Sequence, residues 1–311
     1  MSKPLISVIV PTFNRSQMLT QCLHALERQT VLPQEFEVIV VDDGSTDDTA
    51  MAVAGLTMPF HVKYVRQANA GPGSARNEGI RHATGELVLF IGDDILADPR
   101  LIESHLAAHA TRSDPGVAIL GHIDWPPGMS RSAVMDFVCG PATLQFAYAF
   151  IPDLPTLDFR FFYTSNISLK RQFLLEAAAD GVTFDPDFTA AAFEDSEFAL
   201  RLERRGLRIV YAADALAYHD HWMDLDSFSR REYAAGRMAV VFYRKHPQID
   251  DQLQVRWIGD WTDAIDELTT RPDLQSRLRA LDEHTGTFLR SLVQTLGDLA
   301  DSPDARGTRA P

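Results

Sequence analysis

Cysteine is scarce in this chain of 311 residues, which contains only Cys22 and Cys139. Two cysteines are too few for a disulfide framework or a cysteine-based zinc cluster, so we expect both to be reduced residues of the core. Basic residues are also under-represented, with 29 lysines and arginines against 43 aspartates and glutamates. The net charge of −14 argues against a protein that binds nucleic acid through bulk electrostatics, and we expect no nucleic-acid partner.

Long uninterrupted hydrophobic runs are absent as well. The N-terminus lacks the apolar core and the cleavage site of a signal peptide. The most apolar long stretch, residues 133–151, makes a poor membrane span because it is interrupted by Asp136, Gly140, Pro141 and Gln145. We therefore expect a cytoplasmic protein that is soluble or peripheral at the inner face of the membrane.

Strand and helix patterns alternate along the first part of the chain, which predicts an α/β fold. We expect strands at residues 5–10, 36–41, 61–65, 86–91 and 117–120, and later ones at 164–170 and 207–211. We expect helices at residues 15–28, 46–54 and 71–83, from residue 99 onward, and at 194–205. This order predicts a mostly parallel sheet with helices on both faces, and ligands of such sheets bind beyond the carboxyl ends of the strands.

The second half of the chain has a different composition. Residues 122–163 are rich in proline and aromatic residues, and predict an insertion or flap rather than a separate domain. The pattern is helical from residue 225, and the last residues are polar. We expect a domain over residues 1–222, a helical extension over residues 223–300 and a disordered tail over residues 301–311.

Two adjacent aspartates, Asp93 and Asp94, follow the apolar run at residues 86–91. Like charges at the end of a buried strand repel each other unless a cation or hydrogen-bond donors compensate them. Carboxylate oxygens suit hard cations such as Mg²⁺ or Mn²⁺, and these cations commonly bridge to phosphate. The pair therefore predicts a divalent metal and a phosphorylated ligand at the mouth of the sheet.

Two turns before this pair also carry polar groups. The segment from Gly71 to Arg76 imitates a dinucleotide fingerprint, but Arg76 stands where the third glycine should be, so we do not expect NAD. The remaining interpretations are anion binding at a helix N-terminus and a glycine turn with a solvated arginine. Asp42 and Asp43 end another strand. The geometry of a turn accounts well for one of these two aspartates. The other could then accept a hydrogen bond from a ligand.

Carboxylates and histidines recur later in the chain. Glu194 and Asp195 open a predicted helix, where acids are favoured by the helix dipole or where one of them serves as a general base. His219 and His221 place both rings on one side of an extended chain, where either ring is a structural group or completes an octahedral site begun by Asp94. Residues 228–245 form a basic, aromatic helix that packs on the sheet, or contacts an anionic acceptor or anionic lipid headgroups.

These motifs, in this order, resemble the family 2 glycosyltransferases. The matching strings lie at residues 7–15, 40–47, 69–77, 85–86 with 93–94, and 194–206, and the likeness spans about residues 5 to 220. The resemblance implies the GT-A fold and inverting transfer of one sugar from a nucleotide-diphospho-sugar, foremost a UDP-sugar, in cell-surface or secreted glycan biosynthesis. The Gln-x-x-Arg-Trp motif of polymerising members and transmembrane helices are both absent, which favours single-sugar transfer.

The resemblance also assigns roles to individual residues. Asp195 would be the catalytic base with Glu194 beside it, and Asp94 would bind Mn²⁺ or Mg²⁺. Asp93 would contact the ribose or the metal, and His219 or His221 would be the third ligand. The nucleotide would be bordered by Pro11, Thr12, Phe13, Arg15, Asp43, Gly71 and Arg76, with Asp43 on the uracil ring and Arg76 near the base or the diphosphate. One departure leaves the exact metal ligands open, because Gly92 stands where the first acid of a D-x-D motif belongs.

Two other functions are weighed beside this one: a nucleotidyltransferase, and a catalytically silent protein that binds a nucleotide-sugar. A nucleotidyltransferase usually has a glycine-rich, basic loop near its N-terminus, and residues 11–15 do not match it. The acceptor is a glycan, a lipid-linked molecule or a small molecule, and the sequence does not name the sugar. The helical C-terminal region leaves homodimer formation and peripheral membrane contact open.

Overall fold

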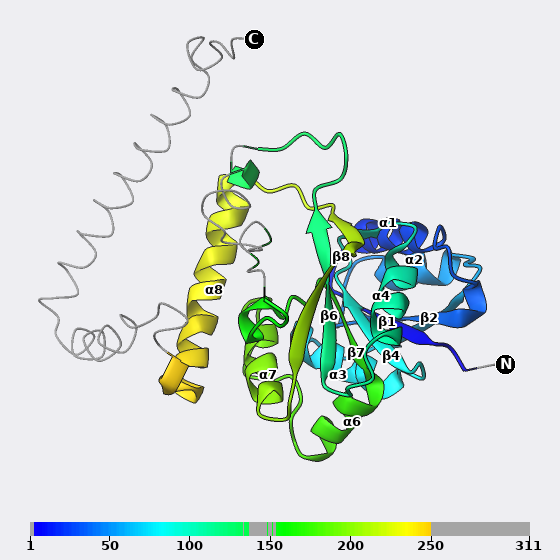
Figure 1. The fold of residues 1–311 in the computed structure, drawn as a ribbon. Helices are drawn as coiled ribbons and strands as arrows, with labels where there is room; N and C mark the ends of the chain where they lie inside the picture. The colour runs from blue at the N-terminus through cyan, green and yellow to red at the C-terminus, as the bar shows by residue number, and fades with distance from the viewer. Residues whose placement is uncertain (1–2, 133, 137–147, 149–150, 152–153, 250–311) are drawn as a thin grey trace, which may run out of the picture. The chain divides into compact units, whose positions relative to one another are not determined.

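The computed structural model describes residues 3–132, 134–136, 148, 151 and 154–249 (Figure 1). The chain divides into two compact units, Met1–Lys245 and His246–Pro311. Part of the expected flap, residues 250–300 of the expected helical extension and the whole tail lie outside the described residues. The long helix α8, Leu225–Lys245, belongs to the first unit, which therefore extends past the boundary expected at residue 222.

An eight-stranded sheet forms the centre of the first unit, in the order β3-β2-β1-β4-β7-β6-β8-β5. Its strands are β1 Ile6–Thr12, β2 Phe36–Asp42, β3 His61–Arg66, β4 Leu87–Ile91, β5 Ile95–Ala97, β6 Val117–Asp124, β7 Asn166–Lys170 and β8 Arg208–His219. Strands β1 to β4 run parallel to one another, whereas β7 is antiparallel to both of its neighbours and β5 is antiparallel to β8. The expected mostly parallel sheet and α/β class are confirmed.

Helices cover both faces of this sheet (Figure 1). Besides α8, the helices of the first unit are α1 Ser16–Leu26, α2 Thr49–Gly55, α3 Pro72–His82, α4 Leu101–Ala110, α6 Arg171–Ala179 and α7 Glu194–Glu203. Alternate residues of β1 point to opposite faces, as the pleat requires. Val8 and Val10 pack with α1, whereas Ile9 meets α3 at Gly79, where a Cβ atom would overlap the isoleucine side chain. A glycine is therefore needed for α3 to lie this close to the sheet.

One expected helix starts later than its sequence pattern indicates. We expected it to begin at residue 46, but α2 begins at Thr49. The Asp47 carboxylate accepts hydrogen bonds from the Thr49 backbone N–H (3.1 Å) and the Thr49 hydroxyl (2.5 Å), and from the Ser16 backbone N–H (3.2 Å). One carboxylate thus serves the first turns of both α1 and α2.

The described residues contain no helix that is both long and apolar enough to cross a membrane.

Candidate active site

The adjacent acids Asp93 and Asp94 lie just beyond β4, beside the end of the neighbouring parallel strand β1. The Thr12 hydroxyl at the end of β1 donates a hydrogen bond to Asp93 Oδ2 (2.7 Å). Arg15 Nη1 then contacts both acids, at 3.0 Å from Asp93 Oδ1 and 2.9 Å from Asp94 Oδ2. The sheet therefore brings Thr12, Arg15 and the acids together, as expected for the carboxyl ends of adjacent parallel strands.

The two acids differ in their electrostatic environment. Burial raises the pKa of Asp93 to about 6, and the negative charge of Asp94 adds to the rise against the contacts from Arg15 and Thr12. Burial acts on Asp94 in the same direction, but His219, Arg15 and His221 outweigh it and hold the pKa of Asp94 below its ordinary value. Asp94 is the more readily ionised of the two, which suits a metal ligand.

Both histidines reach this same carboxylate. Strand β8 runs antiparallel to β5 with His219 opposite Ile95, which places the end of β8 next to the acids. His219 Nε2 lies 3.4 Å from Asp94 Oδ2, and His221 Nδ1 lies 3.6 Å from the same oxygen. The two imidazoles stack at 5.5 Å with 12° between their planes, and Trp125 stacks on His219 at 5.6 Å. Asp94, His219 and His221 therefore converge on one point.

The side chains that converge here are of types that bind divalent metals, although the described residues do not form a complete metal site. His221 Nδ1 is buried and has no hydrogen-bond partner among the described residues. A carboxylate oxygen and imidazole nitrogens are typical ligands of first-row divalent ions. Among the described residues, no three His, Cys, Asp or Glu side chains have the arrangement of a metal cluster. Arg15 supplies the positive charge at the acids in this structure.

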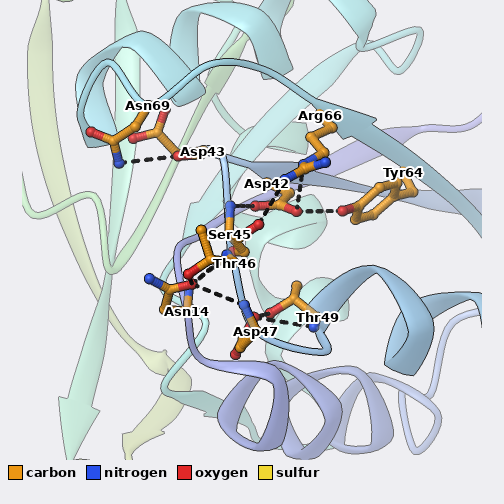
Figure 2. Close-up of polar contacts among 10 residues, drawn as sticks. All are labelled: Asn14, Asp42, Asp43, Ser45, Thr46, Asp47, Thr49, Tyr64, Arg66 and Asn69. Atoms are coloured by element: carbon orange, nitrogen blue, oxygen red, sulfur yellow. Dashed lines mark hydrogen bonds and ion pairs between the residues drawn. The ribbon is translucent and has the colours of Figure 1, made fainter.

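The acids at the end of β2 hold backbone loops together (Figure 2). Asp42 accepts hydrogen bonds from the Ser45 backbone N–H (2.7 Å) and the Tyr64 hydroxyl, and forms an ion pair with Arg66 (3.6 Å). Asp43 is also committed, because its carboxylate accepts from the Gln67 side chain (2.7 Å) and from the backbone N–H groups of Ala70 and Gly71 (both 2.9 Å). The expected bond from Asp43 to a uracil ring stays a prediction.

Asn14 joins the loop after β1 to the loop after β2 (Figure 2). The sequence pattern did not predict this role. The Asn14 side-chain oxygen accepts hydrogen bonds from the backbone N–H groups of Thr46 (2.7 Å) and Asp47 (3.3 Å). Its own N–H donates to the Ser45 hydroxyl (2.9 Å). Asn14 has φ 53°, a left-handed conformation that asparagine tolerates better than most residues. The available signal was an asparagine two residues after the end of a strand.

Other predicted nucleotide residues lie around these loops. Pro11 is part of β1, and the side chain of Phe13 is exposed. Gly71 precedes α3 with φ 89°, and a Cβ atom there would lie 3.2 Å from the Phe188 carbonyl oxygen. The turn before α3 therefore touches the segment that leads to α7.

Glu194 and Asp195 open α7, as expected from the sequence. Asp195 is partly exposed, and its Oδ1 accepts a hydrogen bond from the Ser196 backbone N–H (2.7 Å). Burial of the carboxylate raises the pKa of Asp195 to about 7, and the adjacent charge of Glu194 raises it further, against Arg76 and the backbone N–H groups of Ser196 and Thr164. A carboxylate with a pKa near neutrality is suited to accept a proton.

The Arg76 side chain is shielded from solvent. It is buried, and its Nη1 donates to Glu194 Oε1 at 2.8 Å. The expected contact of Arg76 with the base or the diphosphate stays a prediction. An ion pair between residues so distant in sequence leaves no signal in either local motif.

The chain resembles known proteins over most of its length. Residues 7–137 match the model of Glycosyl transferase family 2. The chain is 31% identical over 277 residues to validoxylamine A glucosyltransferase of Streptomyces hygroscopicus subsp. limoneus, covering 80% of this chain and 58% of that protein. It is 27% identical over 286 residues to chondroitin synthase of Escherichia coli, covering 79% of this chain and 40% of that protein. The chain thus spans less than two thirds of the length of these relatives.

Two solved structures show the same fold. Staphylococcus aureus TarS 1–349 in complex with UDP-GlcNAc has a TM-score of 0.56 at 23% identity, covering 76% of this chain and 66% of that chain. Mannosyltransferase PcManGT from Pyrobaculum calidifontis, in complex with GDP-Man and Mn²⁺, has a TM-score of 0.58 at 23% identity, covering 80% and 65%. At this identity both structures support the GT-A fold alone. The family match, the similarity to validoxylamine A glucosyltransferase and the ordered motifs lead to one conclusion: the chain belongs to glycosyltransferase family 2.

Proposed function

We propose that this protein is an inverting glycosyltransferase that moves one sugar from a UDP-sugar to an acceptor hydroxyl. The observation that carries the proposal is the convergence of Thr12, Arg15 and two histidines on Asp93 and Asp94, at the carboxyl edge of the sheet. A cationic side chain and potential metal ligands at such an edge suit a diphosphate. A cell-surface or secreted glycan, a lipid-linked molecule or a small molecule would supply the hydroxyl.

Asp195 would act as the general base. Its carboxylate would take the proton of the acceptor hydroxyl as that oxygen attacks the anomeric carbon. The attack would come from the side opposite the departing nucleoside diphosphate, which inverts the configuration. Because the pKa of Asp195 is raised to about 7, the carboxylate can both accept and release a proton near neutral pH.

Asp94, together with His219 or His221, would hold a divalent metal. The buried Nδ1 of His221, which has no hydrogen-bond partner among the described residues, supports this assignment, and PcManGT was solved with Mn²⁺. Imidazole ligands favour Mn²⁺ over Mg²⁺, which prefers oxygen ligands and keeps its waters. When bound, the metal neutralises negative charge that develops on the departing diphosphate. Arg15, once released from Asp94, would place its guanidinium near the same phosphates.

The donor proposal rests on the resemblance and on TarS, which was solved with UDP-GlcNAc. Asp43 is proposed to contact the uracil ring, because a carboxylate that accepts three hydrogen bonds keeps a further lone pair. The loop that Asp43 fixes, through Ala70 and Gly71, would then form one wall of the nucleotide site. Thr12, Phe13 and Pro11 would border the other side.

A panel of UDP-, GDP- and dTDP-sugars, each with Mn²⁺, tests the proposal. The cognate donor should stabilise the protein by about 2.7 kcal/mol at a concentration of about 100 times its Kd. Incubation of that donor with candidate acceptors should then release free UDP. Release of pyrophosphate would instead identify a nucleotidyltransferase, and donor binding without any product would identify a silent binding protein. Either result would contradict the proposal.

A further inference from the structure

Helix α3 packs along the segment that precedes the proposed base. The Asn77 side chain donates to the Phe184 carbonyl oxygen (2.8 Å) and accepts from the Phe184 N–H (2.9 Å). A Cβ atom on Gly73 would lie 3.1 Å from Phe184 Cβ and 3.8 Å from Glu194 Cβ. The same helix begins at the loop that Asp43 holds through Ala70 and Gly71. One helix therefore connects the proposed nucleotide site to the start of α7.

The strongest polar contact of this packing is the ion pair between Arg76 and Glu194. Arg76 Nη1 lies 2.8 Å from Glu194 Oε1, and their side chains are only 9% and 4% exposed. The guanidinium carbon also lies 5.6 Å from the centre of the Phe184 ring. Arg76 Nε is buried and has no hydrogen-bond partner among the described residues. The charge of Arg76 is nevertheless paired with the Glu194 carboxylate, and removing either charge would leave the other buried and unpaired.

We infer that Arg76 and Glu194 form a positioning pair that holds Asp195 in place and balances the charge around its carboxylate. The inference rests on the proposed role of Asp195 as the base. It differs from the expectation that Arg76 binds the nucleotide. Besides burial, the Glu194 carboxylate and the Arg76 guanidinium act most strongly on the Asp195 carboxylate, followed by the backbone N–H groups of Ser196 and Thr164. The two side chains carry a full charge, and they act in opposite directions.

The test is a titration of the Asp195 carboxyl group by ¹³C NMR on aspartate-labelled protein, with D195N identifying the signal. Arg76→Met removes a charge that favours ionisation, so the pKa of Asp195 should rise by about one unit. Glu194→Gln removes a charge that opposes ionisation, so the pKa should fall by a similar amount. Arg76→Lys, which keeps the charge, should restore a value near that of the wild type. Arg81→Met, on the exposed side of the same helix, is the matched control and should leave the titration unchanged.

Breaking a buried ion pair can prevent folding, so the double variant R76M/E194Q is included. Compared with E194Q it lacks only the Arg76 charge, and its Asp195 pKa should therefore be higher than that of E194Q. A titration that is the same in E194Q and in the double variant would overturn the inference. So would a loss of about tenfold or more in UDP affinity in R76M but not in E194Q, because it would identify a phosphate ligand.

The NMR titration needs no substrate, so its outcome is separate from that of the proposed function. If the wild type transfers no sugar, the proposed function fails, whereas the titration still decides whether the pair acts on Asp195. If transfer occurs and the titration does not respond, the inference alone fails.

Discussion

The surroundings of the Asp195 side chain disfavour the charged form of its carboxylate. Because burial and Glu194 raise its pKa to about 7, a general base at this position is largely protonated in mild acid. We therefore expect kcat/KM to rise with pH through about 7 and to fall to roughly a tenth of its maximum at pH 6. Initial rates between pH 5.5 and 8.5, at saturating metal, measure this dependence. A flat profile over that range would contradict the assignment of Asp195 as the base.

Arg15 and a metal ion would compete for the same oxygen, Asp94 Oδ2. In this structure Arg15 Nη1 lies 2.9 Å from it, nearer than His219 Nε2 at 3.4 Å or His221 Nδ1 at 3.6 Å. Arg15→Met removes the competing cation, so Mn²⁺ should bind the donor-free protein about tenfold more tightly. Titration of Mn²⁺ followed by electron paramagnetic resonance gives the Kd. Arg100→Met, which alters an exposed arginine, is the control, and weaker Mn²⁺ binding in R15M would refute the competition.

At the scale of elements, the end of β8 depends on an irregularity upstream. The pairing of β6 with β8 shifts register between Gly121 and His122. Asn166 spans the shift by donating to the carbonyl oxygens of His122 (3.0 Å) and Ala215 (2.8 Å). Beyond it, β8 continues to His219 beside the acids. The amide of one side chain therefore fixes the path by which β8 delivers the histidine.

Gly121 leaves the space that this amide occupies, since a Cβ atom there would overlap Asn166. Gly121→Ala should lower the free energy of unfolding by about 1–3 kcal/mol, the usual cost of overpacking. It should also weaken Mn²⁺ binding, because His219 lies on the same strand. Urea unfolding and Mn²⁺ titration measure the two effects. Gly55→Ala, at a position with open space around it, should show neither effect. Equal behaviour of the two variants would count against the proposed role of the register shift.

Two histidines of α4 are buried against β7 in a neutral hydrogen-bonded network. His105 contacts the side chains of Asn166 and Ser168 (both 2.8 Å), and His109 contacts Ser168 (2.9 Å). Burial lowers the pKa of His105 to about 4 and that of His109 to about 3. The unfolded chain, with ordinary histidine pKa values near 6.5, binds more protons than the folded protein below that pH. Their contribution to stability is therefore present above about pH 6.5 and is lost as the pH falls toward 4.

The acids with raised pKa values act in the opposite direction, so the histidine effect is best measured as a difference. Relative to the variant H105Q/H109Q, the wild type should lose up to about 1.4 kcal/mol per pH unit for each histidine between pH 6.5 and 4. Urea unfolding at several pH values provides both curves. Parallel curves for the two proteins would mean that these histidines are not held neutral.

Over the whole molecule, residue patterns predicted the parallel strands β1 to β4. Apolar runs such as Leu87–Ile91 are unambiguous because both faces of the sheet are covered. Strand β5, with three residues, is too short for any periodicity to reveal. The pattern of β8 is broken at its register shift, so the sequence indicated its beginning but not its extension to His219. The antiparallel direction of β7 depends on tertiary pairing, which no local pattern encodes.

The candidate site was predictable to a similar degree. The adjacent acids, the two histidines and the start of α7 could be identified from the sequence, because each follows a strand or opens a helix. The partners of these groups could not, since Arg15 reaches Asp94 and Arg76 reaches Glu194 only through the fold. A positive charge in a sequence motif does not reveal whether it meets a ligand or a carboxylate of the same chain.

The proposed role of Asp195 in removing the acceptor proton is tested most directly by the rate at which the variant Asp195→Asn transfers sugar. Asparagine keeps the size of the side chain but cannot accept the proton. At saturating donor and acceptor, we predict that transfer falls by about 10²–10⁴-fold, while the donor with Mn²⁺ binds as tightly as to the wild type. Transfer near the wild-type rate, with donor binding intact, would contradict the assignment of Asp195 as the general base.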